Sequence, residues 1–391
     1  MKKIQEGVIK TMKHSIVNLE RNLPSSIQSM DEKTLLDLNY QQTMNELITY
    51  AEKAGENHTA YFNDIDMVYH FIHYSTNIQD EKQRKEETKK TYLREIITFC
   101  KTLTTNAADF DISYEEVQNE GSFLKALKPW NIRKFNDWIK VVPNGRNNES
   151  YAVSTLARKL TIINGFLLHL YKNGYITLPL HEHLKKATVR TEDRPNRDLY
   201  YEEVQQLLAF YKDKKNLFNY MIILFLSTTG LRIREVANAK IGDLYKADGK
   251  VWLHVVGKGN KPRDTYISQH LFDCICEYRK RKGLETNLNR LDKDPLLVNN
   301  RLTKFNSNYL SNKVVEIINN TDLPFVKQRE NPITAHTFRH GFAIIAAENN
   351  VELLRIQQTL GHASPHTTSI YLEKHIKRKH NAALSFADSL G

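Results

Sequence analysis

One polar stretch limits the possible folds of this chain more than any other feature. Between His181 and Tyr200 the residues are mostly polar, include Pro195 and show no apolar periodicity, although periodic segments lie on both sides. Such a stretch is typical of a linker. The chain is therefore expected to fold as more than one unit. Its length of 391 residues agrees with two or three domains of roughly 100–200 residues each.

Two helical segments precede this linker. Residues 1–84 are predicted to form a helical extension, with a turn at Ala54–Asn57 between two periodic stretches. Residues 85–180 are predicted to form a second helical unit. Its apolar residues recur at three- and four-residue spacing over Thr91–Cys100, Phe123–Ile139 and Tyr151–Leu170.

The pattern changes after the linker, in residues 201–391. Short β-patterned runs at Val251–Val256 and Asp264–Ile267 predict two strands, joined by a tight turn at Gly257–Lys261. Helical periodicity predicts helices at Tyr201–Tyr211, Phe218–Leu226, Leu271–Lys282, Lys304–Asn319, Thr334–Asn349, Glu352–Leu360 and about Thr367–Arg378. The sequence therefore predicts a mainly α protein with a small antiparallel β-sheet in its last domain.

Charge is distributed unevenly along the chain. The formal net charge is +11 and the pI about 9.2, yet residues 1–84 carry −3 and residues 85–391 carry +14. Residues 22–84 alone hold ten acidic and four basic residues. An anionic partner is expected for the basic part. Bulk charge does not choose among nucleic acid, an anionic membrane surface and acidic proteins.

Membrane insertion and secretion are not expected. The longest strongly apolar run, Met221–Leu226, is far shorter than the roughly 20 residues that span a bilayer. No apolar stretch follows the N-terminal Met-Lys-Lys. The three cysteines, Cys100, Cys274 and Cys276, lack metal-ligand spacing and fit a reducing compartment. A cytoplasmic protein is the expectation.

Four short motifs in the last domain carry groups suited to chemistry. They are Thr229-Gly-Leu-Arg-Ile-Arg-Glu235, the hairpin sequence Gly257-Lys-Gly259, His336-Thr-Phe-Arg-His340, and Leu360-Gly-His362 followed nine residues later by Tyr371. Each motif alone has an ordinary explanation. The first motif is by default a helix-entry turn, and Lys258 a solvent-exposed lysine. In the last motif, His362 is by default a helix cap and Tyr371 a core or surface tyrosine.

The two histidines of the third motif could suggest a metal site. His336 and His340 would share one helix face, as the zinc ligands of metalloproteases do. That zinc pattern needs a glutamate directly after the first histidine, and this chain has Thr337 there. We therefore predict no metal site.

In this order and spacing, the four motifs resemble those of the tyrosine recombinases, the phage integrase and Xer family. The resemblance covers residues 197–378 strongly and residues 86–180 moderately. It implies that residues 85–180 are a helical core-binding domain and residues 201–391 the catalytic domain. Together with the basic linker 181–200 the two would form a C-shaped clamp around DNA. Residues 1–84 lack a clear counterpart.

The resemblance also implies the roles of individual residues. The family's catalytic positions correspond to Arg232, Lys258, His336, Arg339, His362 and Tyr371, with Glu235 and His340 in support. The arginines and histidines would bind the phosphate. The tyrosine would form a 3′-phosphotyrosyl link, and the lysine would protonate the leaving 5′ oxygen. Because the phosphotyrosine keeps the bond energy, the resemblance implies no ATP, metal or other cofactor.

Further basic residues are candidates for contact with the DNA backbone. Composition allows the linker to be either a plain solvated tether or a phosphate-binding connector, and the helix after residue 150 to be either a solvated face or a DNA-facing one. The candidate residues are Arg158, Lys159, Lys185, Lys186, Arg190, Arg194, Arg197 and Lys261. Arg234 departs from the family pattern, which has a small residue at that position. The sequence does not say whether Arg234 touches DNA or perturbs Glu235.

The function implied by the resemblance is site-specific DNA recombination, by a phage or mobile-element integrase or by a chromosome-dimer resolvase. The extra residues 1–84 favour the integrase, with a phage or mobile element as the expected source. The partners would be double-stranded DNA and further copies of the chain, two per site and four in the synapse, in a bacterial cytoplasm. The acidic residues 22–84 favour contact with an accessory protein, although contact with DNA or a buttressing role is also open. The main alternative is a DNA-binding regulator that keeps the recombinase fold without recombination activity. A nicking and relaxing enzyme of the type IB topoisomerase kind is a third possibility.

Overall fold

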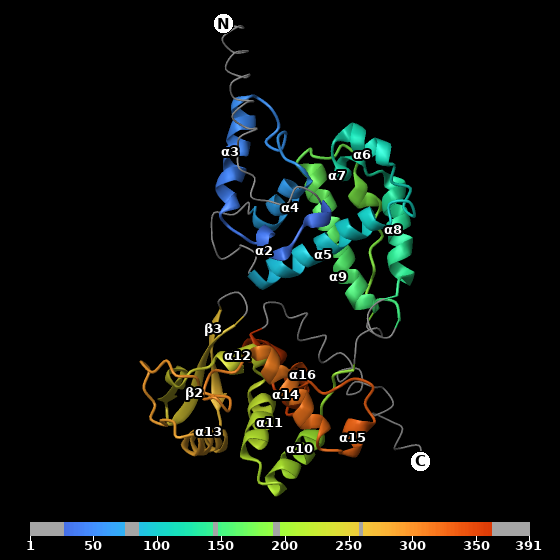
Figure 1. Cartoon of the computed structure of the whole chain (residues 1–391). Helices are drawn as coiled ribbons and strands as arrows, with labels where there is room; N and C mark the ends of the chain where they lie inside the picture. Colours follow the sequence, from blue (N-terminus) through green and yellow to red (C-terminus); the bar gives the residue numbers. More distant parts are fainter. Residues whose placement is uncertain (1–26, 75–85, 144–147, 191–195, 258–260, 362–391) are drawn as a thin grey trace, which may run out of the picture. The chain divides into compact units, whose positions relative to one another are not determined.

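Two compact units make up the chain. The computed structural model describes residues 27–74, 86–143, 148–190, 196–257 and 261–361. Contacts divide the chain between Arg194 and Pro195, so that unit 1 is residues 1–194 and unit 2 is residues 195–391 (Figure 1). This division falls inside the stretch 181–200.

Helices build the described part of unit 1. They are α2 (Glu32–Leu35), α3 (Tyr40–Lys53), α4 (Asp64–His73), α5 (Glu86–Thr105), α6 (Tyr114–Glu120), α7 (Phe123–Ala126), α8 (Pro129–Val141) and α9 (Val153–Lys172), with 3-10 turns η1 (Ile27–Ser29) and η4 (Leu180–His183). One hydrophobic core joins all of them and includes buried side chains from Ile27 to Leu184. Because α2 to α4 share this core with α5 to α9, the core does not divide at residue 84.

Partly buried polar contacts tie the N-terminal helices to the rest of unit 1. Asp64 at the start of α4 accepts hydrogen bonds from the Ser122 hydroxyl, from the Phe123 backbone N–H at 2.8 Å and from the Tyr175 hydroxyl at 2.8 Å. His70 on the same helix lies 2.9 Å from His169 of α9, measured between ring nitrogens. Residues 27–74 are thus an integral part of this unit.

A proline divides one helix that periodicity predicts as continuous. The expected helix Phe123–Ile139 is wrong at Leu127–Lys128, where the structure has extended backbone between α7 and α8. Pro129 occupies the first turn of α8, where its missing N–H costs nothing, and it disfavours helical backbone at Lys128. The apolar pattern continues across the break because both short helices face the same core.

Unit 2 is mainly α with a three-stranded sheet. Its helices are α10 (Tyr201–Asp213), α11 (Leu217–Thr229), α12 (Ile233–Asn238), α13 (Gln269–Arg281), α14 (Ser307–Asn319), α15 (Pro324–Lys327), α16 (Ala335–Glu348) and α17 (Leu353–Leu360), with a 3-10 turn η5 (Ile241–Asp243). The strands β1 (Leu244–Ala247), β2 (Lys250–Val256) and β3 (Pro262–Ile267) form an antiparallel sheet in the order β1-β2-β3. The predicted fold class is confirmed. The helix expected at about Thr367–Arg378 lies outside the described residues.

The first strand of this sheet escapes the sequence pattern. β1 has only four residues, and Leu244 is its one buried position. It joins β2 through Asp248 and Gly249, whose φ angles of +50° and +71° are those of a tight hairpin turn. In β2 the buried residues Val251, Leu253 and Val255 alternate with more exposed ones, as a strand with one buried face requires.

Helix α11 forms the centre of unit 2. Its residues from Met221 to Leu226 are all buried, and it packs against α10, α13 and α16. Even so, none of the helices in the described ranges is long and apolar enough to cross a membrane. The position of α11 matters for the site, because its C-terminal end leads directly into the first of the four motifs.

Candidate active site

The first motif forms a sharp corner between α11 and α12. Helix α11 ends at Gly230, which has a φ of +60° that residues with a Cβ rarely adopt. A Cβ at this position would also lie 2.7 Å from Cδ2 of Leu360 on α17. Arg232 follows as the N-cap residue of α12, with its side chain 31% exposed. The glycine therefore allows α17 to approach the turn that presents Arg232.

Glu235, one turn further along α12, holds Arg232 from two sides. Its buried carboxylate accepts a hydrogen bond from the Arg232 backbone N–H at 2.8 Å and another from Arg232 Nη1 at 3.0 Å. Burial alone would raise the pKa of Glu235. The hydrogen bonds from Arg263 and Arg232, together with their charges, outweigh burial and hold this pKa below its ordinary value. Glu235 is therefore an anion that orients Arg232.

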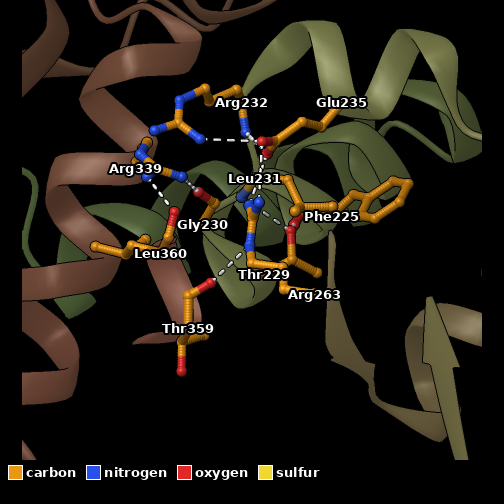
Figure 2. Close-up of polar contacts among 10 residues, drawn as sticks. All are labelled: Phe225, Thr229, Gly230, Leu231, Arg232, Glu235, Arg263, Arg339, Thr359 and Leu360. Carbon is orange, nitrogen blue, oxygen red and sulfur yellow. Dashed lines mark hydrogen bonds and ion pairs between the residues drawn. The ribbon is translucent and has the colours of Figure 1, made fainter. Parts of the chain in front are cut away.

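Arg263 on β3 belongs to this cluster, although the sequence analysis did not single it out. Arg263 donates to both carboxylate oxygens of Glu235, at 3.1 Å from Nη1 and 2.8 Å from Nη2. Its Nε donates to the backbone carbonyl of Thr359 at 3.0 Å (Figure 2). The strand pattern offers no signal for this role, since an arginine at a half-buried strand position looks like any other edge cation.

Arg339 on α16 is buried beneath the corner, with 1% of its surface exposed. Its Nη1 donates to the carbonyl of Gly230 at 2.8 Å, and its Nη2 donates to the carbonyl of Leu360. These carbonyls belong to the C-terminal ends of α11 and α17, whose last carbonyls have no partner within their own helix. Arg339 thus joins the first motif to the motif that begins at Leu360 (Figure 2).

His336 and His340 lie one helical turn apart on α16, near the same cations. His336 keeps an exposed surface, yet its pKa is lowered to about 4. The first cause is that surrounding protein displaces water from the ring, and the second is repulsion by charges that include Arg197, Arg339 and Arg232. His340 is buried, with its Nδ1 3.8 Å from the carboxylate of Asp198. At neutral pH the His336 ring is therefore uncharged.

The structure brings four of the predicted site residues together, and four others lie outside the described residues. Arg232, Glu235, His336 and Arg339 meet at the corner formed by α12, α16 and the end of α17. Lys258, His362, Tyr371 and Arg194 lie outside the described residues. Within the described ranges, no group of three or more His, Cys, Asp or Glu side chains could hold a metal ion.

The candidate DNA-contacting residues differ in their surroundings. Lys159 is mostly buried, and both it and Arg158 form ion pairs with Glu95 of α5. The remaining described candidates, together with the unusual Arg234, are exposed: Lys185, Lys186 and Arg190 in unit 1, and Arg197, Arg234 and Lys261 in unit 2. Glu235 forms ion pairs with Arg232 and Arg263. Contact of these cations with DNA stays a prediction.

Comparison with known proteins places this corner in a family. A model of the phage integrase family matches residues 197–378, which include all four motifs. The tyrosine recombinase XerC of Caldanaerobacter subterraneus is 25% identical over 313 residues, covering 77% of this chain and 81% of the relative. The XerC of Listeria innocua is 25% identical over 307 residues, covering 78% and 91%. Residues 197–378 belong to the phage integrase family of tyrosine recombinases.

Solved structures of this family share the fold of the tyrosine recombinase described here. A lambda integrase tetramer bound to a Holliday junction aligns with a TM-score of 0.54 at 14% identity, covering 86% of this chain and 87% of that one. A lambda integrase dimer bound to a COC′ core site aligns with a TM-score of 0.52 at 14% identity, covering 90% and 95%. At this level of identity the likeness concerns the fold alone.

Proposed function

We propose that this tyrosine recombinase is a site-specific DNA recombinase that cleaves and rejoins DNA through a 3′-phosphotyrosine at Tyr371. The observation that carries the proposal is the cationic corner. Glu235 holds Arg232 there, and Arg339 joins the carbonyls of Gly230 and Leu360 at the ends of α11 and α17. Membership of the family and the order of the four motifs support it.

The corner has the charge that phosphoryl transfer needs. Negative charge builds up on the non-bridging oxygens of the phosphate in the transition state, and preorganised cationic donors stabilise it. Arg232 keeps about a third of its side chain exposed, so it can meet a phosphate from solvent. Its planar guanidinium suits two parallel hydrogen bonds to phosphate oxygens and stays charged at any working pH.

The remaining steps can be assigned so that protons balance. The Tyr371 oxygen attacks phosphorus and the bond to the 5′ oxygen breaks. His336, neutral at pH 7 because of its low pKa, accepts the tyrosine proton, and Lys258 supplies a proton to the leaving 5′ oxygen. His362 donates a hydrogen bond to the phosphate. The reverse sequence, with another 5′ hydroxyl as nucleophile, rejoins the strand and needs no external energy source.

The partners follow from this chemistry and from the relatives. We propose that two copies bind each DNA site between core-binding and catalytic domains, and that four copies synapse two sites. The lambda integrase structures, a dimer on a core site and a tetramer on a Holliday junction, are the precedent for such assemblies. A phage or mobile element is the proposed source.

The test requires a DNA site, which the Tyr371→Phe chain can select from a random-sequence duplex pool. Duplexes of the selected sequence are then made with a nick stepped one nucleotide at a time, so that cleavage releases a short fragment and traps the enzyme. The wild type should form a covalent protein–DNA adduct on one or a few of these duplexes, and Tyr371→Phe on none. Tight, sequence-specific binding by the wild type without an adduct would overturn the proposal in favour of a DNA-binding regulator.

A further inference from the structure

Arg263 connects three segments of unit 2 that are far apart in the sequence. From β3 its guanidinium reaches Glu235 on α12, 28 positions earlier, and the carbonyl of Thr359 in the last turn of α17, 96 positions later. Only 11% of the side chain is exposed. Its Nε, Nη1 and Nη2 all donate to protein oxygens, so its role in the reaction would be exerted through these neighbours.

Two glycines make room for this side chain. A Cβ at Gly257 would lie 2.9 Å from Arg263 Nη1, and a Cβ at Gly361 would lie 3.2 Å from its Cδ. Gly257 is also close to Glu235, whose Oε1 lies 3.5 Å from the same Cβ position. In the sequence, Gly257 directly precedes Lys258, and Gly361 directly precedes His362. Arg263 therefore packs against the backbone from which two of the proposed catalytic residues continue.

Arg263 also sets the net charge of the corner. Arg232, Arg263, Arg339 and Glu235 together carry two net positive charges. Without Arg263, Glu235 would keep Arg232 as its main cationic partner, and the net charge would fall to one. A buried carboxylate strongly attracts any cation that remains beside it. The donors of Arg232 would then be directed more toward Glu235 and less toward a phosphate.

We propose that Arg263 is a positioning residue for DNA cleavage, which neutralises Glu235 so that Arg232 remains available to the scissile phosphate. The same residue fixes the hairpin base at Gly257 and the end of α17 around that pair. This inference rests on the proposed function. It goes beyond the family motifs, which supply the groups that touch the phosphate but not the group that offsets their carboxylate.

A set of four full-length variants tests this role on the nicked duplexes described above. The variants are Arg263→Gln, Glu235→Gln, the double variant, and Arg281→Gln as a matched control, since Arg281 is an exposed arginine of α13 paired with Glu277. Adduct formation is timed at saturating DNA, and DNA affinity and melting temperature are measured separately. Arg263→Lys is added because it keeps the charge but loses the two-pronged contact.

The expected pattern is specific to charge balance. Arg263→Gln should slow adduct formation about 100-fold at saturating DNA, the scale of losing one transition-state donor, with DNA affinity changed less than about 3-fold. Glu235→Gln should restore about 10-fold of that loss in the double variant, because removing the carboxylate returns the net charge to two. Arg263→Lys should fall between wild type and Arg263→Gln, and Arg281→Gln should match the wild type.

Three results would overturn the inference. One is an Arg263→Gln rate equal to wild type, and another is a double variant as slow as Arg263→Gln or slower, which indicates a purely structural contribution. The third is the absence of any adduct with the wild type. That result rejects the proposed function itself, because there is then no reaction for Arg263 to support. The first two results reject only the role of Arg263, so the two kinds of failure are distinguishable.

Discussion

Each unit of this protein buries a glutamate between two cations, and the two arrangements differ in how many hydrogen bonds the carboxylate accepts from them. In unit 1, Glu95 lies 2.6 Å from Nζ of Lys159 and 3.2 Å from Nη2 of Arg158, which are neighbours on α9. In unit 2, Glu235 lies 3.0 Å from Nη1 of Arg232 and 2.8 Å from Nη2 of Arg263, which come from separate segments. Both glutamate side chains are less than a tenth exposed.

The difference lies in how completely the partners satisfy the carboxylate. Glu95 receives one contact from each cation, and the ammonium of Lys159 also lies 4.8 Å from the ring centre of Tyr151. Glu235 receives four hydrogen bonds, two from Arg263 and two from Arg232. A third guanidinium, Arg339, holds the neighbouring turns in place. A buried glutamate with two cations is therefore not by itself a phosphate site, and the surrounding geometry makes the difference.

The largest expected effect comes from Arg339. Arg339→Lys should slow adduct formation about 1,000-fold, because lysine cannot bind two carbonyls and a phosphate from one planar group. The melting temperature should fall by about 5–10 °C for the lost hydrogen bonds. The rate is measured on the nicked duplexes at saturating DNA.

Arg279 provides a matched control for Arg339. It is fully buried in the same unit, and it donates to the backbone carbonyls of Glu285, Pro295 and Leu296 at 2.6, 2.7 and 3.0 Å. Arg279→Lys should lower the melting temperature by a similar amount without slowing adduct formation by the folded enzyme. Equal loss of rate in both variants would show that Arg339 acts only through stability.

The two glutamates themselves give the next largest effect. Glu235→Gln should slow adduct formation about 10-fold, because Arg232 loses its charged anchor while the corner gains a net positive charge. Glu95→Gln should leave that rate unchanged and lower the free energy of unfolding by about 2–3 kcal/mol, because the mostly buried Lys159 loses its partner. Urea denaturation and the adduct assay measure the two quantities. A slower rate for Glu95→Gln would contradict the distinction between the sites.

The sequence predicted those parts of the fold and site that local pattern determines. Arg232 and Glu235 are three positions apart at the start of a helix, and the i, i+3 contact between them follows from that spacing. The strands Val251–Val256 and Asp264–Ile267 were predicted to within a few residues because one face is buried. The order of the four motifs then indicated the family, and comparison confirms the family and the fold class.

The missed features depend on contacts that local pattern does not encode. Arg263 acquires its role from partners 28 and 96 positions away, so nothing beside it in the sequence marks it out. Strand β1 has a single buried residue and cannot show alternation. By contrast, the apolar periodicity of residues 27–74 does predict packed helices, and buried side chains such as Leu35, Leu47 and Met67 place them in the core of unit 1.

The smallest expected effect concerns a buried histidine of unit 1. In unit 1, the pKa of His70 is lowered to about 3 because it is buried and faces His169 and His58. The folded chain therefore keeps His70 neutral at pH values where the unfolded chain binds a proton, so stability is lost as pH falls from about 6.5 toward about 3. Between pH 7.5 and pH 5 this loss is about 2 kcal/mol.

Replacing the ring tests this pH dependence. His70→Phe keeps an aromatic ring against Phe62 and Tyr74 but has no proton to gain, so its stability should change less with pH. Hydrogen exchange of α4 and α9 amides in the full chain, at pH 7.5 and pH 5, reports on unit 1. The wild type should lose about 2 kcal/mol of protection there that His70→Phe retains, while the protection of α11 and α16 should change equally in both chains. An equal loss in α4 and α9 of both chains would place the acid sensitivity elsewhere than at His70.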